Sequence, residues 1–171
     1  MLKTFKIINS FVFDIDGVLT DGSLLVMESG AMLRKMNVKD GYALQLAIKR
    51  GYNIIVMSGG KSPEAKKRLE LLGIKKIFTE VKDKLQKLKE LVNEFQLNPE
   101  HIVYMGDDIP DLEVMQYCGL AACPADAVSE IKNISKYVST FNGGCGCVRD
   151  VIEKVMKLQN RWTADTHIPS T

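Results

Sequence analysis

The sequence lacks the features that mark membrane, secreted or nucleic-acid-binding proteins. Its 171 residues contain no apolar run long enough to span a bilayer, and residues 1–6 lack the apolar core of a signal peptide. The formal net charge of +2 favours neither a nucleic acid nor a membrane surface as a partner. We therefore expect a cytoplasmic protein, with no nucleic acid and no membrane among its partners.

Paired cysteines are also missing. The chain has four cysteines, and no two of them are spaced as Cys-x-x-Cys, so neither a zinc site nor a disulfide framework is predicted. Cys118 and Cys123 flank a predicted short strand, and we expect them to pack as small apolar residues. Cys145 and Cys147 lie in a glycine-rich stretch, where a steric role is favoured over a redox role.

Repeats and low-complexity linkers are absent, and the composition is that of a globular domain. Hydrophobic residues make up 46% of the chain and charged residues 26%. Apolar runs alternate with helical patterns, which is typical of βαβ units and a parallel sheet. We expect one α/β domain over residues 1–158, with a doubly wound, Rossmann-like sheet. The tail, residues 159–171, is expected to be disordered or to lie on a neighbouring subunit.

One apolar run ends abruptly in acidic residues. Residues 11–13 read as a buried strand, and Asp14, Ile15 and Asp16 follow directly. Ligands bind at the carboxyl ends of parallel strands, and Gly17 permits a sharp turn there. Two carboxylates this close would not both stay ionised without a cation, and Mg²⁺ binds carboxylate and phosphate oxygens. From this segment alone, a Mg²⁺ site and a plain acidic turn are equally supported.

Three later segments favour the Mg²⁺ site over the plain acidic turn. The apolar run 53–57 ends at Ser58, and the run 102–105 is followed by Gly106 and Asp107. Lys84 lies in a helical-looking stretch between these runs. This order resembles the four motifs of the haloacid dehalogenase superfamily, which are an acidic residue, a serine, a lysine and a second acidic residue. The resemblance covers nearly the whole chain and implies a phosphatase.

Four segments narrow this resemblance, namely residues 14–22, 39–42, 106–108 and 143–149. They resemble the cap-less phosphatases of 3-deoxy-D-manno-octulosonate 8-phosphate. The resemblance implies hydrolysis of this sugar-acid phosphate for lipopolysaccharide precursor synthesis, with Mg²⁺ as the cofactor. The main alternative is a phosphatase of a nine-carbon, sialic-type sugar acid 9-phosphate. A receiver-type phosphoacceptor signalling module is an alternative of a different class.

The resemblance also implies a role for each motif residue. Asp14 would attack phosphorus to form an aspartyl-phosphate, and Asp16 would serve as the general acid and base. Ser58 and Lys84 would bind the phosphoryl oxygens. The side chains of Asp14 and Asp107 and the backbone carbonyl of Asp16 would hold Mg²⁺. The residues expected to orient these groups are Asp108 and Asp111.

The residues that contact the sugar acid are less sharply defined. The octulosonate phosphatases usually carry an arginine directly after the Ser/Thr-Gly motif, and this sequence has Gly60 at that position. The missing guanidinium would otherwise make a two-pronged contact to a carboxylate. Lys61 or Arg68, or a residue of another subunit, would have to replace it. The candidate substrate-binding residues are Asp40, Gly41, Gly59, Lys61 and Arg68.

Residues 22–36 are expected to form a β-hairpin flap after the first strand. Positions 24–27 are apolar without interruption, so both faces of that strand need cover. The alternative is a hairpin folded flat on its own core. The spacing of the motifs leaves no room for a cap domain, which needs at least about 50 residues. We therefore expect a homotetramer assembled through the flap, in which neighbouring subunits close the active sites.

Overall fold

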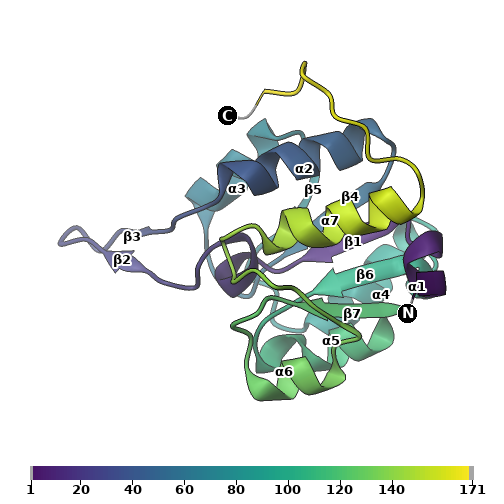
Figure 1. The fold of residues 1–171 in the computed structure, drawn as a ribbon. Coiled ribbons are helices and arrows are strands. Elements are labelled where there is room, and N and C mark those ends of the chain that lie inside the picture. Colours follow the sequence, from purple (N-terminus) through teal and green to yellow (C-terminus); the bar gives the residue numbers. More distant parts are fainter. Residues whose placement is uncertain (1, 170–171) are drawn as a thin grey trace.

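The computed structural model describes residues 2–169 and is built on a six-stranded parallel sheet (Figure 1). The strand order is β5-β4-β1-β6-β7-β8. The strands are β1 (Ser10–Phe13), β4 (Asn53–Met57), β5 (Lys76–Phe78), β6 (Ile102–Met105), β7 (Leu120–Cys123) and β8 (Tyr137–Val138). Because β1 pairs with β4 on one side and β6 on the other, the order reverses at β1. The predicted doubly wound α/β fold is confirmed.

Helices cover both faces of the sheet (Figure 1). One face carries α1 (Leu2–Ile7), α2 (Val38–Lys49), α3 (Pro63–Leu71) and α7 (Cys147–Leu158). The other carries α4 (Lys84–Glu94), α5 (Leu112–Tyr117) and α6 (Ser129–Ile134). None of the helices within residues 2–169 has both the length and the apolarity needed to cross a bilayer.

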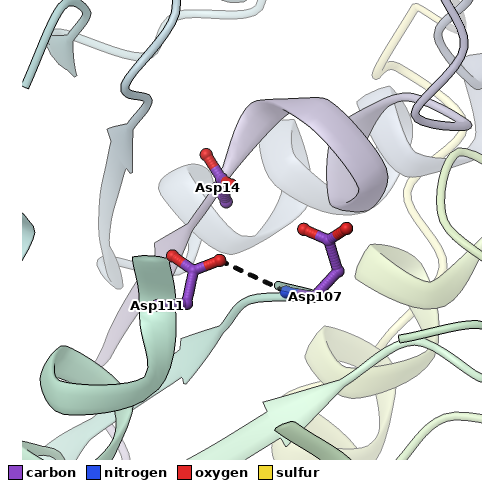
Figure 2. A group of neighbouring side chains, drawn as sticks. All are labelled: Asp14, Asp107 and Asp111. Carbon is purple, nitrogen blue, oxygen red and sulfur yellow. Dashed lines mark hydrogen bonds between the residues drawn. The ribbon is translucent and has the colours of Figure 1, made fainter. Parts of the chain in front are cut away.

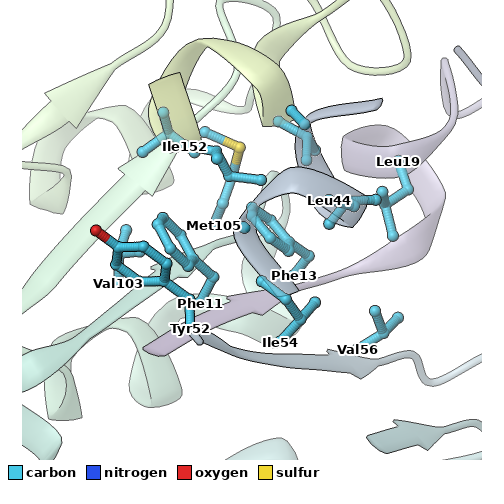
Figure 3. Close-up of a cluster of buried hydrophobic side chains, with 14 of the residues drawn as sticks. Phe11, Phe13, Leu19, Leu44, Tyr52, Ile54, Val56, Val103, Met105 and Ile152 are labelled. Atoms are coloured by element: carbon cyan, nitrogen blue, oxygen red, sulfur yellow. The ribbon is translucent and has the colours of Figure 1, made fainter. Parts of the chain in front are cut away.

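Strand β1 supplies both apolar cores, because successive side chains of a strand point to opposite faces. Phe11 and Phe13 stack with their ring centroids 6.0 Å apart in the core under α2 and α7 (Figure 3). Val12 lies in the opposite core, together with Tyr104 of β6. All four residues of β1 are buried, so the strand is held rigidly up to the point where Asp14 begins the polar site.

The predicted flap is present as a separate antiparallel hairpin of β2 (Leu25–Val26) and β3 (Met32–Leu33). It projects away from the sheet (Figure 1). Leu25 and Val26 are 63% and 66% exposed, so the hairpin does not fold flat on its own core. Nothing within residues 2–169 covers these apolar side chains.

Two helices differ from the sequence pattern. Helix α1 was not predicted; it is short and held by Phe5, whose ring packs edge-on against Tyr137 at 5.6 Å. Helix α6 begins only at Ser129, although the sequence pattern from residue 125 onward is already helical, since Pro124 starts a turn closed by the hydrogen bond from the Ala127 amide. Both differences arise from contacts distant in sequence or from local turn chemistry.

The tail folds back on its own chain, so the expectation that it is disordered or lies on a neighbour is wrong as far as Pro169. Trp162 meets Tyr42 of α2 edge-on, with ring centroids 6.3 Å apart. The Asp165 amide donates to the Tyr42 hydroxyl at 2.9 Å, and its carboxylate pairs with Lys49 at 2.6 Å. Residues 170 and 171 lie outside the described part of the chain.

Candidate active site

A polar cavity of about 290 Å³ lies at the carboxyl ends of β1, β4 and β6. This is the point of an open α/β sheet where ligands bind, because the strand order reverses there. Its lining residues are Asp14, Asp16, Gly17, Gly22, Ser58, Gly59, Gly60, Lys84, Asp107, Asp108, Pro110 and Asp111. The structure therefore brings the residues of all four motifs together in one site.

The chain turns sharply where β1 ends. Asp14 accepts a hydrogen bond from the Ile15 amide at 2.7 Å, and Ile15–Leu19 forms one irregular helical turn. Inside this turn Gly17 has a φ of +83°. A Cβ atom at Gly17 would lie 2.0 Å from the Asp107 Oδ2 atom, so only glycine lets these two loops approach each other.

Lys84 bridges two carboxylates at the floor of the cavity. Its Nζ atom lies 2.9 Å from Asp14 Oδ2 and 2.7 Å from Asp111 Oδ1. Asp111 also accepts hydrogen bonds from the Tyr104 hydroxyl at 2.8 Å and from the Asp107 amide at 3.3 Å. Asp111 thus holds Lys84 in place, which is the geometry that the sequence-based hypothesis requires of it. Tyr104 was not predicted, because its apolar strand context gives no sign of a polar partner.

One carboxylate oxygen from each of Asp14, Asp107 and Asp111 lies within 4.8 Å of the others (Figure 2). Burial, followed by repulsion from Asp14 and Asp111, raises the pKa of Asp107 to about 7. Burial and the Asp111 charge also raise the pKa of Asp14, against the opposing effect of Lys84. Burial alone would lower the pKa of Lys84, but the two carboxylates outweigh it and raise that pKa, so Lys84 stays charged.

This acidic group fits a hard divalent cation. One lysine faces three carboxylates, which leaves two negative charges without a counter-charge when all are ionised. The buried Oδ1 atom of Asp107 has no hydrogen-bond partner within residues 2–169. Both oxygens of Asp111 are already engaged, so Asp14 and Asp107 are the carboxylates best placed to hold a cation. Oxygen donors of this kind suit Mg²⁺.

The carboxylate of Asp16 is held by Arg34, which follows β3 of the hairpin. Arg34 Nε lies 2.6 Å from Asp16 Oδ1, and Arg34 Nη2 lies 3.2 Å from Asp16 Oδ2. Only 9% of the Arg34 side chain is exposed. The motifs did not point to Arg34, because its partner lies 18 residues away and no local pattern links the two. The only available signal was that Arg34 is the one arginine of the flap, beside the apolar residues of β3.

Ser58 directly follows β4 and is buried at the cavity wall. Its Oγ atom accepts a hydrogen bond from the Gly60 amide at 3.2 Å, which leaves the hydroxyl proton able to donate to a bound group. The Val81 amide donates to the Ser58 carbonyl and fixes this loop against the segment that leads into α4. Gly59 lines the cavity beside Ser58, as expected.

The other candidate substrate-binding residues do not line this cavity. Lys61 is exposed outside it. Asp40 is buried and accepts a hydrogen bond from the Arg149 amide at 2.7 Å, so it anchors the first turn of α7 instead. Gly41 is packed against α3, since a Cβ atom there would lie 3.3 Å from Arg68 Nη2. Arg68 lines smaller cavities beside α3.

Asp108 lines the cavity at its exposed edge. Its side chain is exposed and accepts a hydrogen bond from the Ile109 amide at 2.8 Å, so it caps the short helical turn Ile109–Asp111. No contact joins its carboxylate to Lys84 among the described residues. Of the two residues expected to orient the site, Asp111 is the one that contacts Lys84.

The glycine-rich loop, residues 143–146, packs against the turn that follows β1. A Cβ atom at Gly143 would lie 2.0 Å from the Gly17 carbonyl oxygen, and the Gly144 amide donates to the Val18 carbonyl at 2.9 Å. The buried Cys147 thiol also contacts the Val18 carbonyl, at 3.3 Å. All four cysteines are free, and Cys145 is the exposed one.

Fold, site and family comparison together define the class of protein. A family model described as haloacid dehalogenase-like hydrolase matches residues 74–152, which include Lys84 and Asp107. The doubly wound sheet and the carboxylates that follow β1 complete the motif set that the sequence resembles. The class is that of the haloacid dehalogenase-like hydrolases, and within it the phosphatases.

Three relatives identify the family within this class. A 3-deoxy-D-manno-octulosonate 8-phosphate phosphatase, KdsC, from Yersinia pestis is 32% identical over 154 residues, which are 90% of this chain and 82% of that protein. The Moraxella catarrhalis enzyme of the same name was solved in complex with magnesium ion, phosphate ion and KDO. It is 31% identical, with a TM-score of 0.90 over 93% of this chain and 91% of its own. A probable YrbI family phosphatase from Pseudomonas syringae is 36% identical, with a TM-score of 0.91 over 94% and 91%. The chain belongs to the 3-deoxy-D-manno-octulosonate 8-phosphate phosphatase family.

Proposed function

We propose that this protein hydrolyses 3-deoxy-D-manno-octulosonate 8-phosphate to the free sugar acid and phosphate, with Mg²⁺ as its cofactor. The observation that carries the proposal is the Lys84 bridge between Asp14 and Asp111, which sets one positive charge beside a carboxylate at the end of β1. The relatives of known name act on this ester, and the Moraxella structure holds magnesium, phosphate and the sugar acid. The reaction would supply the free acid for lipopolysaccharide precursor synthesis.

Asp14 is the proposed nucleophile. The Ile15 amide fixes one of its oxygens, and Lys84 contacts the other. A carboxylate oxygen of Asp14 forms a bond to phosphorus while the bond between phosphorus and the sugar oxygen breaks, which yields an aspartyl-phosphate. Water then cleaves this intermediate and releases phosphate. Lys84 balances negative charge on the phosphoryl group during both steps.

The carboxylates of Asp14 and Asp107 and the backbone carbonyl of Asp16 are the proposed ligands of Mg²⁺. When bound, the ion offsets the repulsion between a dianionic phosphate and the anionic carboxylates. The unpartnered Oδ1 atom of Asp107 supports this assignment. Asp111 is proposed to act indirectly, by holding Lys84.

Asp16 is the proposed proton-transfer group. It lies two residues beyond Asp14, lines the cavity, and has 36% of its side chain exposed. It would protonate the sugar oxygen as that oxygen leaves, and then take a proton from the attacking water. Ser58 would donate its hydroxyl proton to a phosphoryl oxygen, since its own oxygen is held by the Gly60 amide.

The hairpin supports a homotetramer. Its exposed apolar side chains are Leu24, Leu25, Val26, Met27, Met32 and Leu33. A contiguous apolar surface of this kind marks a protein interface. Copies of the chain joined through the hairpin would cover these side chains and bring a neighbouring subunit over each cavity. This arrangement would take the place of a cap domain in excluding water.

The nucleophile assignment is tested by acid-quenched mass spectrometry. The protein is mixed with the octulosonate 8-phosphate and Mg²⁺ and stopped within milliseconds. The peptide that contains Asp14 should gain the mass of one phosphoryl group, while free phosphate accumulates over many turnovers. Asp14→Asn should remain folded and give neither signal. A label that persists without phosphate release would instead indicate a receiver-type module, and full turnover by Asp14→Asn would exclude Asp14 as the nucleophile.

A further inference from the structure

Arg34 stands between two cavities. On one side, its guanidinium holds the Asp16 carboxylate at the catalytic cavity. On the other side, it faces a smaller cavity of about 220 Å³ between the hairpin and α3. The residues that line this smaller cavity are Met32, Leu33, Arg34, Met36, Glu64, Ala65 and Arg68. A group bound in the catalytic cavity can therefore reach Arg34 at the boundary between the two.

The Arg34 guanidinium also lies where a side chain at position 60 would project. A Cβ atom on Gly60 would be 3.7 Å from Arg34 Nη2 and 3.4 Å from Asp16 Oδ2. A second guanidinium at position 60 would meet a like charge there. In this chain, the hairpin thus supplies a guanidinium beside the position where Gly60 has no side chain.

The pairing leaves donors on Arg34 but occupies Asp16. A guanidinium has five N–H donors in a rigid fork, and Asp16 takes two of them. A third donor makes only a long contact of 3.5 Å to the Met32 carbonyl. Both oxygens of Asp16 accept hydrogen bonds from Arg34. Because such a charge-assisted contact stabilises the deprotonated carboxylate, loosening it favours proton transfer by Asp16.

We propose that Arg34 recognises the carboxylate of the substrate, and that this carboxylate draws the guanidinium away from Asp16 and frees Asp16 for proton transfer. The inference rests on the proposed function, in which the substrate is a sugar-acid phosphate. A phosphate ester without a carboxylate leaves Arg34 on Asp16. Arg34 is thus a specificity-determining residue for the substrate and a positioning residue for Asp16. Selectivity for the acid then appears in kcat as well as in KM.

The test compares two esters. One is the octulosonate 8-phosphate, and the other is a pentose 5-phosphate, which has a terminal phosphate ester and no carboxylate. In Arg34→Met, we expect kcat/KM for the sugar acid to fall by about tenfold or more, because a two-pronged charged contact is lost. The kcat for the pentose ester should rise, because Asp16 is no longer held. Arg34→Lys keeps the positive charge but loses the two-pronged contact. Its kcat/KM for the sugar acid should therefore lie between those of the wild type and Arg34→Met.

Lys35→Met is the matched control. Lys35 is the next residue of the hairpin, its side chain is 79% exposed, and its contact with Asp21 is 3.9 Å long. The substitution removes the same charge from the same segment, and both esters should be hydrolysed as by the wild type. Thermal melting of each variant shows whether the fold is retained.

Product inhibition gives a second measurement. The free eight-carbon acid should inhibit pentose-ester hydrolysis by the wild type about tenfold more strongly than by Arg34→Met. If Arg34→Met lowers kcat/KM for both esters by the same factor and leaves inhibition by the free acid unchanged, Arg34 has only a structural role and the inference is wrong. Failure of the proposed function would look different, because the wild type itself would then show no preference for the sugar acid.

Discussion

The ammonium group of Lys84 lies 2.9 Å from Asp14 and 2.7 Å from Asp111, and it is the cation that the structure places among three clustered carboxylates. These contacts join the end of β1, the start of α4 and the loop after β6. Each segment is held by a different part of the sheet, so the sheet sets the distances within the site. The remaining negative charge makes the site dependent on a divalent cation and on pH.

Without metal, the protein should lose stability as the pH rises from about 4 to about 7. The pKa of Asp107 in the folded state is raised to about 7 by burial and by Asp14 and Asp111, whereas the unfolded chain has the ordinary value. The proton on this group therefore favours the folded state at low pH, and this contribution is lost as the pH rises from about 4 to about 7. In the presence of a chelator, Tm should fall between about pH 4 and pH 7 and then level off, and Mg²⁺ should raise Tm more at about pH 7 than at about pH 5.

Asp107→Asn is the control for that titration. It removes the ionisable group and a proposed Mg²⁺ ligand, so Tm should depend less on pH and respond weakly to Mg²⁺. An equal Mg²⁺ effect at both pH values in the wild type would contradict the assignment of Asp107.

Tyr104→Phe should weaken the site without destroying it. The Tyr104 hydroxyl donates to Asp111 at 2.8 Å in a fully buried position. Its removal leaves a buried carboxylate short of one donor, at a cost of about 1–3 kcal/mol in the free energy of unfolding. The kcat should fall by less than in Asp14→Asn, because Lys84 still contacts Asp111. Tyr117→Phe is the control, since the Tyr117 hydroxyl makes no hydrogen bond within residues 2–169; equal effects of the two changes would exclude this role for Tyr104.

Val26→Asp should dissociate the proposed oligomer. Val26 is 66% exposed on the apolar hairpin of the single chain. In the proposed oligomer this position would be buried in an interface, where a carboxylate without a partner is strongly unfavourable. Size-exclusion chromatography with light scattering should show smaller particles, and activity per chain should fall with them. Ser29→Asp, at the exposed turn of the same hairpin, should change neither property. A fully active monomeric Val26→Asp would show that neighbouring subunits do not complete the site.

Trp162→Ala should lower the stability of the folded chain. Trp162 contacts Tyr42 edge-on and lies 5.5 Å from the Arg149 guanidinium, so it fastens the tail to α2 and α7. A loss of about 1–3 kcal/mol in the free energy of unfolding is expected for a half-buried aromatic residue. Thr163→Ala, at an exposed neighbouring position, provides the comparison by thermal melting. Equal stability of both variants would mean that the tail contributes nothing to the fold.

The sheet and the catalytic constellation were predictable from local patterns. The runs before Asp14, Ser58 and Gly106 are short, apolar and followed by turn-forming residues, and they became β1, β4 and β6. Parallel strand ends meet at one edge, so the motif residues had to converge there. Periodicity and turn chemistry carry this information within a few residues.

Contacts between distant segments were not predictable in the same way. The pairing of Arg34 with Asp16 depends on where the hairpin crosses the cavity, and no residue pattern encodes that angle. Asp40 belongs to a segment that resembles a substrate-binding segment, and its hydrogen bond from the Arg149 amide in the first turn of α7 joins positions 109 residues apart. The tail has no apolar periodicity, and only the position of Tyr42 on α2 reveals a partner for Trp162.

The most direct test is kcat/KM for Mg²⁺-dependent phosphate release from a panel that includes the octulosonate 8-phosphate, a nine-carbon sugar-acid 9-phosphate and simple sugar phosphates. We predict the highest value for the eight-carbon acid, which would show that a glycine at position 60 is compatible with this substrate. A clear preference for the nine-carbon acid, or no release from any of these esters, would contradict the proposed function.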